Sequence, residues 1–341
     1  MSGPLCGPFP FSGFIIHAMP FDFAAVNTPF RMQPGLRRLA PGEPQLTPNR
    51  PGDPALLEKL AVLLAHPQQA LITAPGFDAA PALRALCDHA ATEHPEAFVI
   101  DPDGACHARH LGWSLCGIEP VGNGAAEIGA CLGALPAEQR LPALLSLTFA
   151  EDFAVIDAAS GRIPWLAVCL PSHWAPEDKV GRHFAEVHAP VADNALLISA
   201  AAHLMRLVTG TERWERFVWT ITRSAMLHQH PKHDVATPWH ANLDAQGLAA
   251  QAFFRTERQT FIPMPAQQQA IFTIHVETHP LTDALAAPAD AQLVHDALAS
   301  MSTPVLAYRG LTDARERLLQ WLAERSRTPA GGVDRVVDPA R

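Results

Sequence analysis

The chain carries 17 histidines among its 341 residues. Neutral imidazole is the commonest side-chain ligand for metals, so this number raises the expectation of a metal or haem site. One segment, 171–191, places His188 close to the cations Lys179 and Arg182. Pro190 ends the helix predicted before His188, and a ring held at such a helix end is well fixed for axial ligation. A lone histidine is nevertheless more often a core or surface residue.

A second concentration of chemistry lies on a predicted strand between residues 253 and 265. Along it, one set of residues (Arg255, Glu257, Gln259) alternates with another (Thr256, Arg258, Thr260). The period of two sends these sets to opposite faces of a sheet. A solvated face with cross-strand ion pairs would explain so many polar groups. Alternatively, an arginine there clamps a carboxylate with two hydrogen bonds, as a haem propionate requires.

A third group of residues forms a histidine-rich segment, HQHPKHD, followed by His240. His228, His230 and His233 fall within six residues and could reach one metal ion. Their spacing does not fit one helix face, and Pro231 favours a loop between strands. Both a solvated loop and a metal site stay open.

Several common active-site signatures are missing from the sequence. The string GNGAAEIG at 122–129 approaches a dinucleotide fingerprint, but Glu127 stands where the third glycine belongs. There is no GxxxxGK, GxSxG or HExxH string, so phosphate-loop, serine-hydrolase and zincin chemistry lose their usual signatures. The cysteines show no close pairing and no CxxCH string, so cluster ligands are absent and any haem would be bound non-covalently. They are Cys6, Cys87, Cys106, Cys116, Cys131 and Cys169.

Composition limits the class of protein further. Apolar residues make up 48% and charged residues 17%, which is globular rather than disordered. The formal net charge of −9 argues against a nucleic-acid partner. Neither a signal peptide nor an apolar run long enough for a membrane span is recognisable, so we expect a soluble, cytoplasmic protein.

Apolar spacing and turn signals divide the chain into regions. Helical spacing occurs near 56–64, 80–92, 135–147, 194–209, 288–301 and 311–326. Runs favouring β structure cover 153–157, 164–170, 217–222, 252–262 and 270–277. The predicted organisation is an extended arm (1–55), a helical region (56–148), a sheet domain (149–310), and a C-terminal helix and tail (311–341). The sheet domain is α+β, with five antiparallel strands and helices across one face, and could hold a flat ligand between them.

Four strings together resemble the haem-dependent oxidative N-demethylases, a dimethylamine monooxygenase-like family whose haem sits in a PAS-like domain. They are FRMQPGLRRL (30–39), FAEDFAVID (149–157), LAVCLPSHWAPEDKVGRHFAEVHAPV (166–191) and RTERQTFIPMPAQQQAIFTIHVETHPL (255–281). Their order and spacing agree over most of the chain, so the resemblance is more specific than any one motif. It implies a PAS-like five-stranded sheet for 149–310.

The resemblance also implies an enzyme and its cofactor. The expected activity is that of a monooxygenase with haem b, which uses O2 and electrons from a separate flavin or iron–sulfur reductase. An N-methyl group of a small amine would be oxidised to a hemiaminal that releases formaldehyde. The family's HxPV element corresponds to His188, Pro190 and Val191, which makes His188 the proximal iron ligand. Lys179, Arg182, Arg255 and Arg258 become candidates for propionate anchoring, and Glu257 and Asp152 for the amine side of the pocket.

Two alternatives remain open at this point. The chain could be a PAS-type haem sensor of gas or redox state without turnover, in which case His203 could supply the ligand instead. A haem-free scaffold that kept the fold is the third possibility. No kinase, cyclase or DNA-binding segment is recognisable, which favours the enzyme over a sensor that signals within the same chain.

Overall fold

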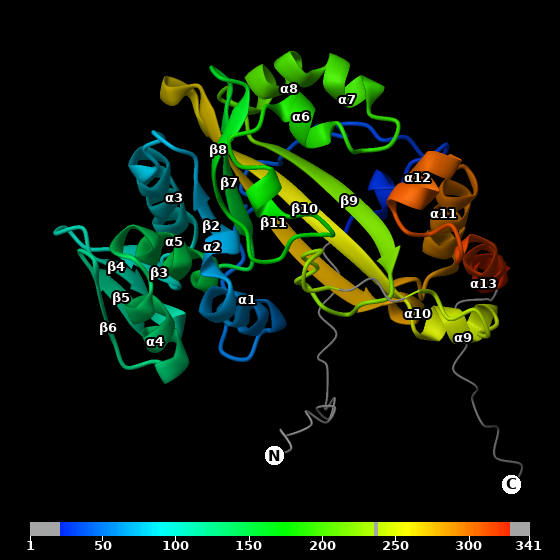
Figure 1. Ribbon diagram of the computed structural model, residues 1–341, viewed down its shortest axis with the longest axis horizontal. Coiled ribbons are helices and arrows are strands. Elements are labelled where there is room, and N and C mark those ends of the chain that lie inside the picture. Colours follow the sequence, from blue (N-terminus) through cyan, green and yellow to red (C-terminus); the bar gives the residue numbers. More distant parts are fainter. Residues whose placement is uncertain (1–20, 235–237, 328–341) are drawn as a thin grey trace, which may run out of the picture.

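The computed structural model describes residues 21–234 and 238–327, which form two antiparallel sheets and surrounding helices (Figure 1). The α+β class is thereby confirmed. The larger sheet contains β1 (Arg37–Arg38), β2 (Leu71–Thr73), β7 (Asp152–Asp157), β8 (Arg162–Ala167), β9 (Trp214–Thr222), β10 (Phe253–Met264) and β11 (Gln269–Pro280). The smaller sheet contains β3 (Phe98–Ile100), β4 (Cys106–Ala108), β5 (Trp113–Cys116) and β6 (Glu119–Gly122).

The larger sheet has seven strands rather than the predicted five, in the order β1-β9-β10-β11-β7-β8-β2. The five predicted strands correspond to β7–β11 and lie next to one another in it. β1 pairs with β9 and β2 pairs with β8, so each adds a short strand at one edge. Strands of two or three residues are too short to show a period of two in the sequence.

The rest of the described chain consists of α-helices and the segments that connect them. The α-helices are α1 (Pro54–Ala65), α2 (Pro67–Ala70), α3 (Ala80–Glu93), α4 (Ala126–Ala134), α5 (Ala137–Thr148), α6 (Phe184–His188), α7 (Ala195–Ser199), α8 (Ala201–Val208), α9 (Ala245–Ala250), α10 (Leu281–Ala284), α11 (Pro288–Ala299), α12 (Thr303–Tyr308) and α13 (Arg315–Arg327). The helix predicted over 194–209 forms as α7 and α8, which meet at Ala200. Among the described helices, none combines the length and apolar character needed to cross a bilayer.

The two faces of the larger sheet are covered by different parts of the chain. On one face, Phe184 of α6 and Met205 of α8 pack against Phe261 and Ile156, so we call it the α6–α8 face. On the opposite face, α9, α11 and α13 pack on β9 and β10, and α1, α3 and α5 pack on β7, β10 and β11. Figure 1 shows α6–α8 as a separate layer over the sheet. Helices therefore cover both faces of the larger sheet, and not only one face as predicted.

The region predicted to be helical, 56–148, also contains the four-stranded sheet, which sequence analysis missed. Its strands are three or four residues long and joined by tight turns. They belong to the same buried cluster as α1, α3 and α5, through residues such as Phe98 and Leu115. The correction has a simple cause, since short strands on a helical layer leave no clear periodic signal.

The GNGAAEIG string has a structural explanation within this region. A Cβ atom at Gly122 or Gly124 would lie 2.9 Å from the side chain of Trp113, and one at Gly129 would lie 2.1 Å from it. The glycines therefore give the Trp113 indole the space to pack against α4. No phosphate-binding role is needed to account for them.

The described part of the predicted arm, residues 21–55, packs along the larger sheet. β1 adds to the edge of β9, Phe21 packs edge-on against Phe254, and Phe30 packs edge-on against Trp219. At the other terminus, α13 shares one buried cluster with α11 and these aromatic residues. The boundary predicted at 310 thus passes through a continuous core. Residues 1–20, with Cys6, lie outside the described residues.

Candidate functional site

The His188 ring is fixed at the C-terminal end of α6. Its Nδ1 donates a hydrogen bond to the carbonyl oxygen of Phe184 at 2.8 Å, and the two rings lie 4.1 Å apart. Beyond the helix, Asn194 donates to the carbonyl oxygens of His188 and Ala189 and holds the turn in place. A proton on Nδ1 leaves the lone pair on Nε2, which has no hydrogen-bond partner in the described chain.

His188 is held in its neutral form by its surroundings. Burial lowers the pKa of its imidazole to about 4, with Arg216 and Lys179 lowering it further and the Phe184 carbonyl opposing them. A neutral imidazole with a free Nε2 is the form that binds metal ions. The local environment thus prepares this side chain to donate electrons to a ligand rather than to carry a proton.

Arg216 is the most informative residue that sequence analysis missed. It lies on β9 opposite Gln259, which places it on the same face of the sheet as Glu257. Its Nε atom is buried without a hydrogen-bond partner in the described chain, and burial lowers the pKa of its guanidinium. A buried donor without an acceptor is costly and suits a site that receives an anion. In the sequence, Arg216 is marked only by its place on a strand. The residues around it come from distant segments, so no local pattern shows its role.

Glu257 is the centre of a small polar network on the same face. Ser172 donates to one of its carboxylate oxygens, and Gln259 Nε2 donates to the other at 2.5 Å. Ser172 in turn accepts from Arg255 Nε at 2.9 Å. The following residue, His173, has a positive φ of 59°, a backbone conformation that is uncommon outside glycine. The network fixes the carboxylate, and sequence analysis missed Ser172 because the contact joins segments 85 residues apart.

Arg255 lies in this network but is not available to a ligand. Only 1% of it is exposed, and its guanidinium donates to the carbonyl oxygens of Met226 and Leu227 at 3.1 and 2.9 Å. Weaker contacts reach the carbonyl oxygens of Leu170 and Pro171 at 3.3 and 3.5 Å. Each of its three nitrogens thus has an acceptor within the chain, so Arg255 fastens two loops to β10, and we leave it out of the set of anion anchors.

Of the other predicted cations, the structure brings Lys179 close to His188 and leaves two elsewhere. Lys179 is half-buried, donates to the carbonyl oxygen of Val187 at 3.0 Å, and has its pKa lowered by burial. Arg182 is exposed. Arg258 lies on the opposite face of the sheet, where it donates to Glu215 at 3.0 Å and to the carbonyl oxygen of Pro44 at 2.8 Å.

Asp152 is likewise committed to the interior. It is 1% exposed, accepts from the backbone N–H groups of Cys169 and Leu170, and pairs with Lys59 at 3.2 Å. These contacts tie β7 to the chain after β8. Of the two predicted carboxylates, Glu257 is therefore the one that lies with His188 and Arg216 on the α6–α8 face.

The histidine-rich loop does not form a metal centre in the described residues. His228 contacts the carbonyl oxygen of Cys169, His230 contacts Glu177, and His233 contacts Gln69. No group of three or more His, Cys, Asp or Glu side chains is arranged to hold a metal ion in residues 21–234 and 238–327. His240 and His203 are both exposed, whereas His188 is partly buried.

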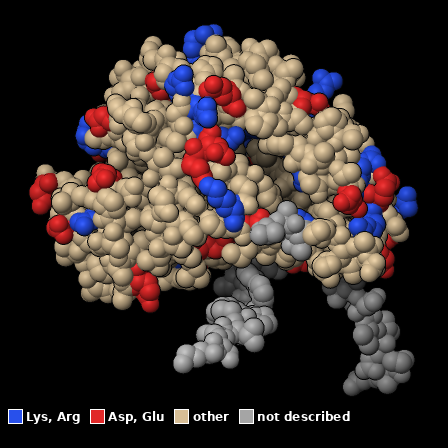
Figure 2. Space-filling model, in the orientation of Figure 1, with Lys and Arg blue, Asp and Glu red and all other residues tan. Residues whose placement is uncertain are grey.

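A hollow opens over β9 between the α6–α7 segment and α12 (Figure 2). The last residue of α12, Tyr308, is close enough to Glu257 for the carboxylate to affect the phenol, whose pKa is raised mainly by burial. Arg216 and Glu257 share one face of the sheet, and Arg216 is close enough to His188 to lower the pKa of its imidazole.

A comparison with known families identifies the family of this chain. The family model described as haem-dependent oxidative N-demethylase, alpha subunit-like, matches residues 55–319. The match includes α6, both strands that carry Arg216 and Glu257, and α12. Because it covers well over half of the chain, the protein belongs to the haem-dependent oxidative N-demethylase alpha subunit-like family.

Proposed function

We propose that this protein is a haem-dependent monooxygenase that removes an N-methyl group from a small amine and releases formaldehyde. The observation that carries the proposal is the His188 imidazole, which is neutral, fixed through Nδ1 and free at Nε2 within a family that depends on haem. The alternation along β10 supports it too, because Glu257 and Gln259 are directed toward the same face.

The residues under the α6–α8 layer fit a haem. His188 would hold the iron through Nε2, and the unpaired Arg216 would bind a propionate, with Lys179 as the second cation near His188. The inner strands have the order β8-β7-β11-β10-β9, which is the arrangement we propose to be PAS-like. The cofactor would be haem b, bound without covalent bonds.

The haem would supply the oxidation of the N-methyl C–H bond with O2, using electrons from a separate flavin or iron–sulfur reductase. The chain itself binds and orients. The Glu257 carboxylate would pair with the cationic amine, and its fixed oxygens would set the position of the methyl group. Apolar residues of the layer, such as Phe184, would keep water from the reacting carbon. The resulting hemiaminal would break down to the shorter amine and formaldehyde.

Formaldehyde release tests this function directly. The haem-loaded protein is incubated with O2, a surrogate ferredoxin reductase and a panel of N-methylamines. We expect formaldehyde to form only with the complete system, and Glu257→Gln to lower the rate by about 100-fold at one subsaturating amine concentration. Gln251→Glu, which changes the charge of an exposed residue by one unit, serves as a surface control. Haem binding without formaldehyde from any amine would contradict the enzyme and favour the sensor.

A further inference from the structure

A second cluster of reactive side chains lies on the four-stranded sheet, in a segment that precedes His188 in the sequence. Its strands pair so that Val99, His107, Ser114 and Val121 form one row across β3, β4, β5 and β6. Neighbouring positions such as Phe98 and Leu115 are buried in the core. The row therefore lies on the outer face of the sheet, where a ligand can reach it.

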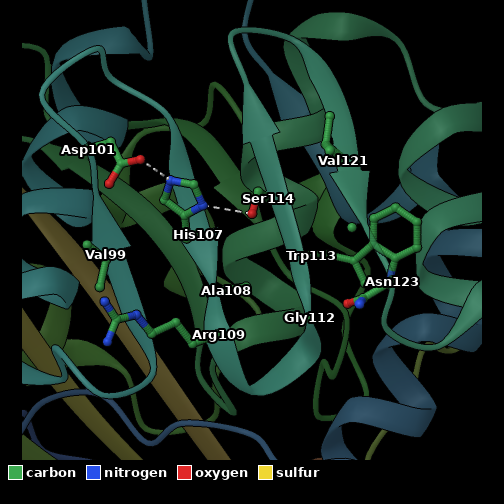
Figure 3. A pocket seen from close by; sticks show the side chains of 11 residues that line it. Val99, Asp101, His107, Ala108, Arg109, Gly112, Trp113, Ser114, Val121 and Asn123 are labelled. Carbon is green, nitrogen blue, oxygen red and sulfur yellow. Dashed lines mark hydrogen bonds and ion pairs between the residues drawn. The ribbon is translucent and has the colours of Figure 1, made fainter.

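Asp101 extends this row into a line of three functional groups. Its Oδ2 atom lies 2.8 Å from His107 Nε2, and His107 Nδ1 lies 2.8 Å from Ser114 Oγ (Figure 3). The carboxylate is positioned by the turn after β3, which Gly104 closes with a positive φ of 87°. Figure 3 shows the imidazole between the carboxylate and the hydroxyl.

The hydrogen-bond partners decide where the protons lie. An ionised carboxylate only accepts, so His107 Nε2 carries the proton that Asp101 receives. His107 Nδ1 is then an acceptor, and the Ser114 hydroxyl donates to it. This is the proton arrangement of a serine activated by a histidine that a carboxylate orients, with the roles of the two ring nitrogens exchanged.

The line of residues opens into a pocket of about 480 Å³. Arg109 and Asn123 also line it, and neither side chain has a polar partner in the described chain. A guanidinium and an amide are donors that can stabilise the negative oxygen of a tetrahedral intermediate. Val99, Val121 and Trp113 add apolar surface. A pocket that combines these open donors with the hydroxyl of Ser114 suits a small ester with an apolar acyl group.

We propose that Ser114 is a nucleophile for acyl transfer from small carboxylic esters. Its Oγ atom forms a bond to the ester carbonyl carbon and gives its proton to His107 Nδ1. The bond from that carbon to the alcohol oxygen breaks, and the alcohol leaves with this proton. Water then attacks the acyl-serine with His107 as base, which releases the acid and restores Ser114. The activity is independent of the haem proposal and uses none of its residues.

Covalent labelling tests the nucleophile. A fluorophosphonate probe is added to the full-length protein, and the modified peptide is located by mass spectrometry. We expect Ser114 to be labelled, and the label to be lost in Ser114→Ala and reduced by about 100-fold or more in His107→Ala. Ser160→Ala is the matched control, because Ser160 Oγ donates to Asp157 and has no histidine partner. Labelling that persists in His107→Ala, or no labelling of Ser114, would overturn the proposal.

Ester hydrolysis tests the positioning role of Asp101. With p-nitrophenyl acetate, Asp101→Asn should lower kcat by about 100-fold with little change in KM, and Asp101→Glu should recover part of the loss. Each variant is compared by thermal unfolding, so that a loss of fold is recognised. The haem-free and the haem-loaded protein should hydrolyse the ester at the same rate, which separates this activity from haem binding. Equal hydrolysis by the Ser114→Ala variant and the parent protein would contradict the proposal.

Discussion

Two histidines in this protein have different surroundings and, we infer, different chemistry. His188 is the last residue of α6 and is partly buried, and its Nδ1 donates to a backbone carbonyl oxygen. His107 lies on the outer face of a small sheet, with 29% of its side chain exposed, and its Nε2 contacts a carboxylate. A carbonyl partner fixes a neutral ring with a free lone pair, whereas a carboxylate partner supports a ring that gains a proton during reaction.

The two regions also differ in how they are built. The strands that carry Arg216 and Glu257 are nine and twelve residues long and lie at the centre of the fold. The strands that carry His107 and Ser114 have three and four residues and are packed on one face only. We infer that the interior site depends on buried polar contacts, whereas the outer site depends on local turns and glycines.

The largest expected effect is the loss of Arg255, which breaks the interior region. Arg255→Met leaves at least two buried carbonyl oxygens without a donor and should lower the free energy of unfolding by about 3–5 kcal/mol. Arg109→Met, in the outer region, removes an exposed side chain that has no polar partner in the described chain. It should change the free energy of unfolding by less than about 0.5 kcal/mol. Urea unfolding of both variants measures the contrast, and equal effects would contradict it.

A pair of glycines in α4 tests the construction of the outer region. In Gly129→Ala the new methyl group would displace the Trp113 ring, so we expect a loss of about 1–3 kcal/mol despite the better helix propensity. Gly133→Ala, in the same helix, meets no atom within 4 Å and should stabilise the protein by up to about 1 kcal/mol. Thermal unfolding compares the two. A stabilising Gly129→Ala would show that Trp113 is not held there.

Substitution of Arg216 tests which cation binds the haem propionates. Arg216→Gln should weaken haem binding by about tenfold, since a hydrogen bond to a charged group is lost. Arg258→Gln, on the opposite face of the sheet, should leave the affinity unaltered. Titration of the haem-free protein with hemin, followed by absorbance, measures both. A larger effect of Arg258→Gln would place the propionates elsewhere.

The smallest expected effect is the pH dependence that His188 contributes. The folded protein holds its pKa at about 4, below the unfolded value of about 6.5. The unfolded chain therefore binds the proton more tightly, and stability falls as pH drops from about 6.5 toward 4. At about pH 5.5 the haem-free protein should lose about 1 kcal/mol relative to His188→Leu. A difference in the free energy of unfolding between the two proteins that is the same at every pH would contradict this prediction.

Much of the interior architecture could be predicted from the sequence. Strands β7–β11 have six or more residues rich in β-branched and aromatic side chains, so their pattern is clear. Period two correctly separated Arg255 and Glu257 from Arg258. It did not show that the Arg255 guanidinium is bound by carbonyl oxygens, because those acceptors come from loops on two other segments.

The missed features share a physical cause, which is that they depend on contacts between distant residues. Ser172 and Arg216 have no local pattern that marks them, and their importance comes from Glu257 and His188 across the fold. The outer sheet was missed because its strands have only three or four residues. His188 stays a prediction, and it rests on a sequence neighbourhood that resembles a family rather than on spacing alone.

Ligation of the haem iron by His188 is tested most directly by the visible spectra of the haem-loaded protein and of its His188→Gly variant. We expect a Soret band typical of histidine ligation in the parent protein, its loss in the variant, and its return when imidazole is added to occupy the vacated position. His203→Gly should keep the parent spectrum. A His188→Gly variant that keeps the unaltered spectrum without imidazole would contradict ligation by His188.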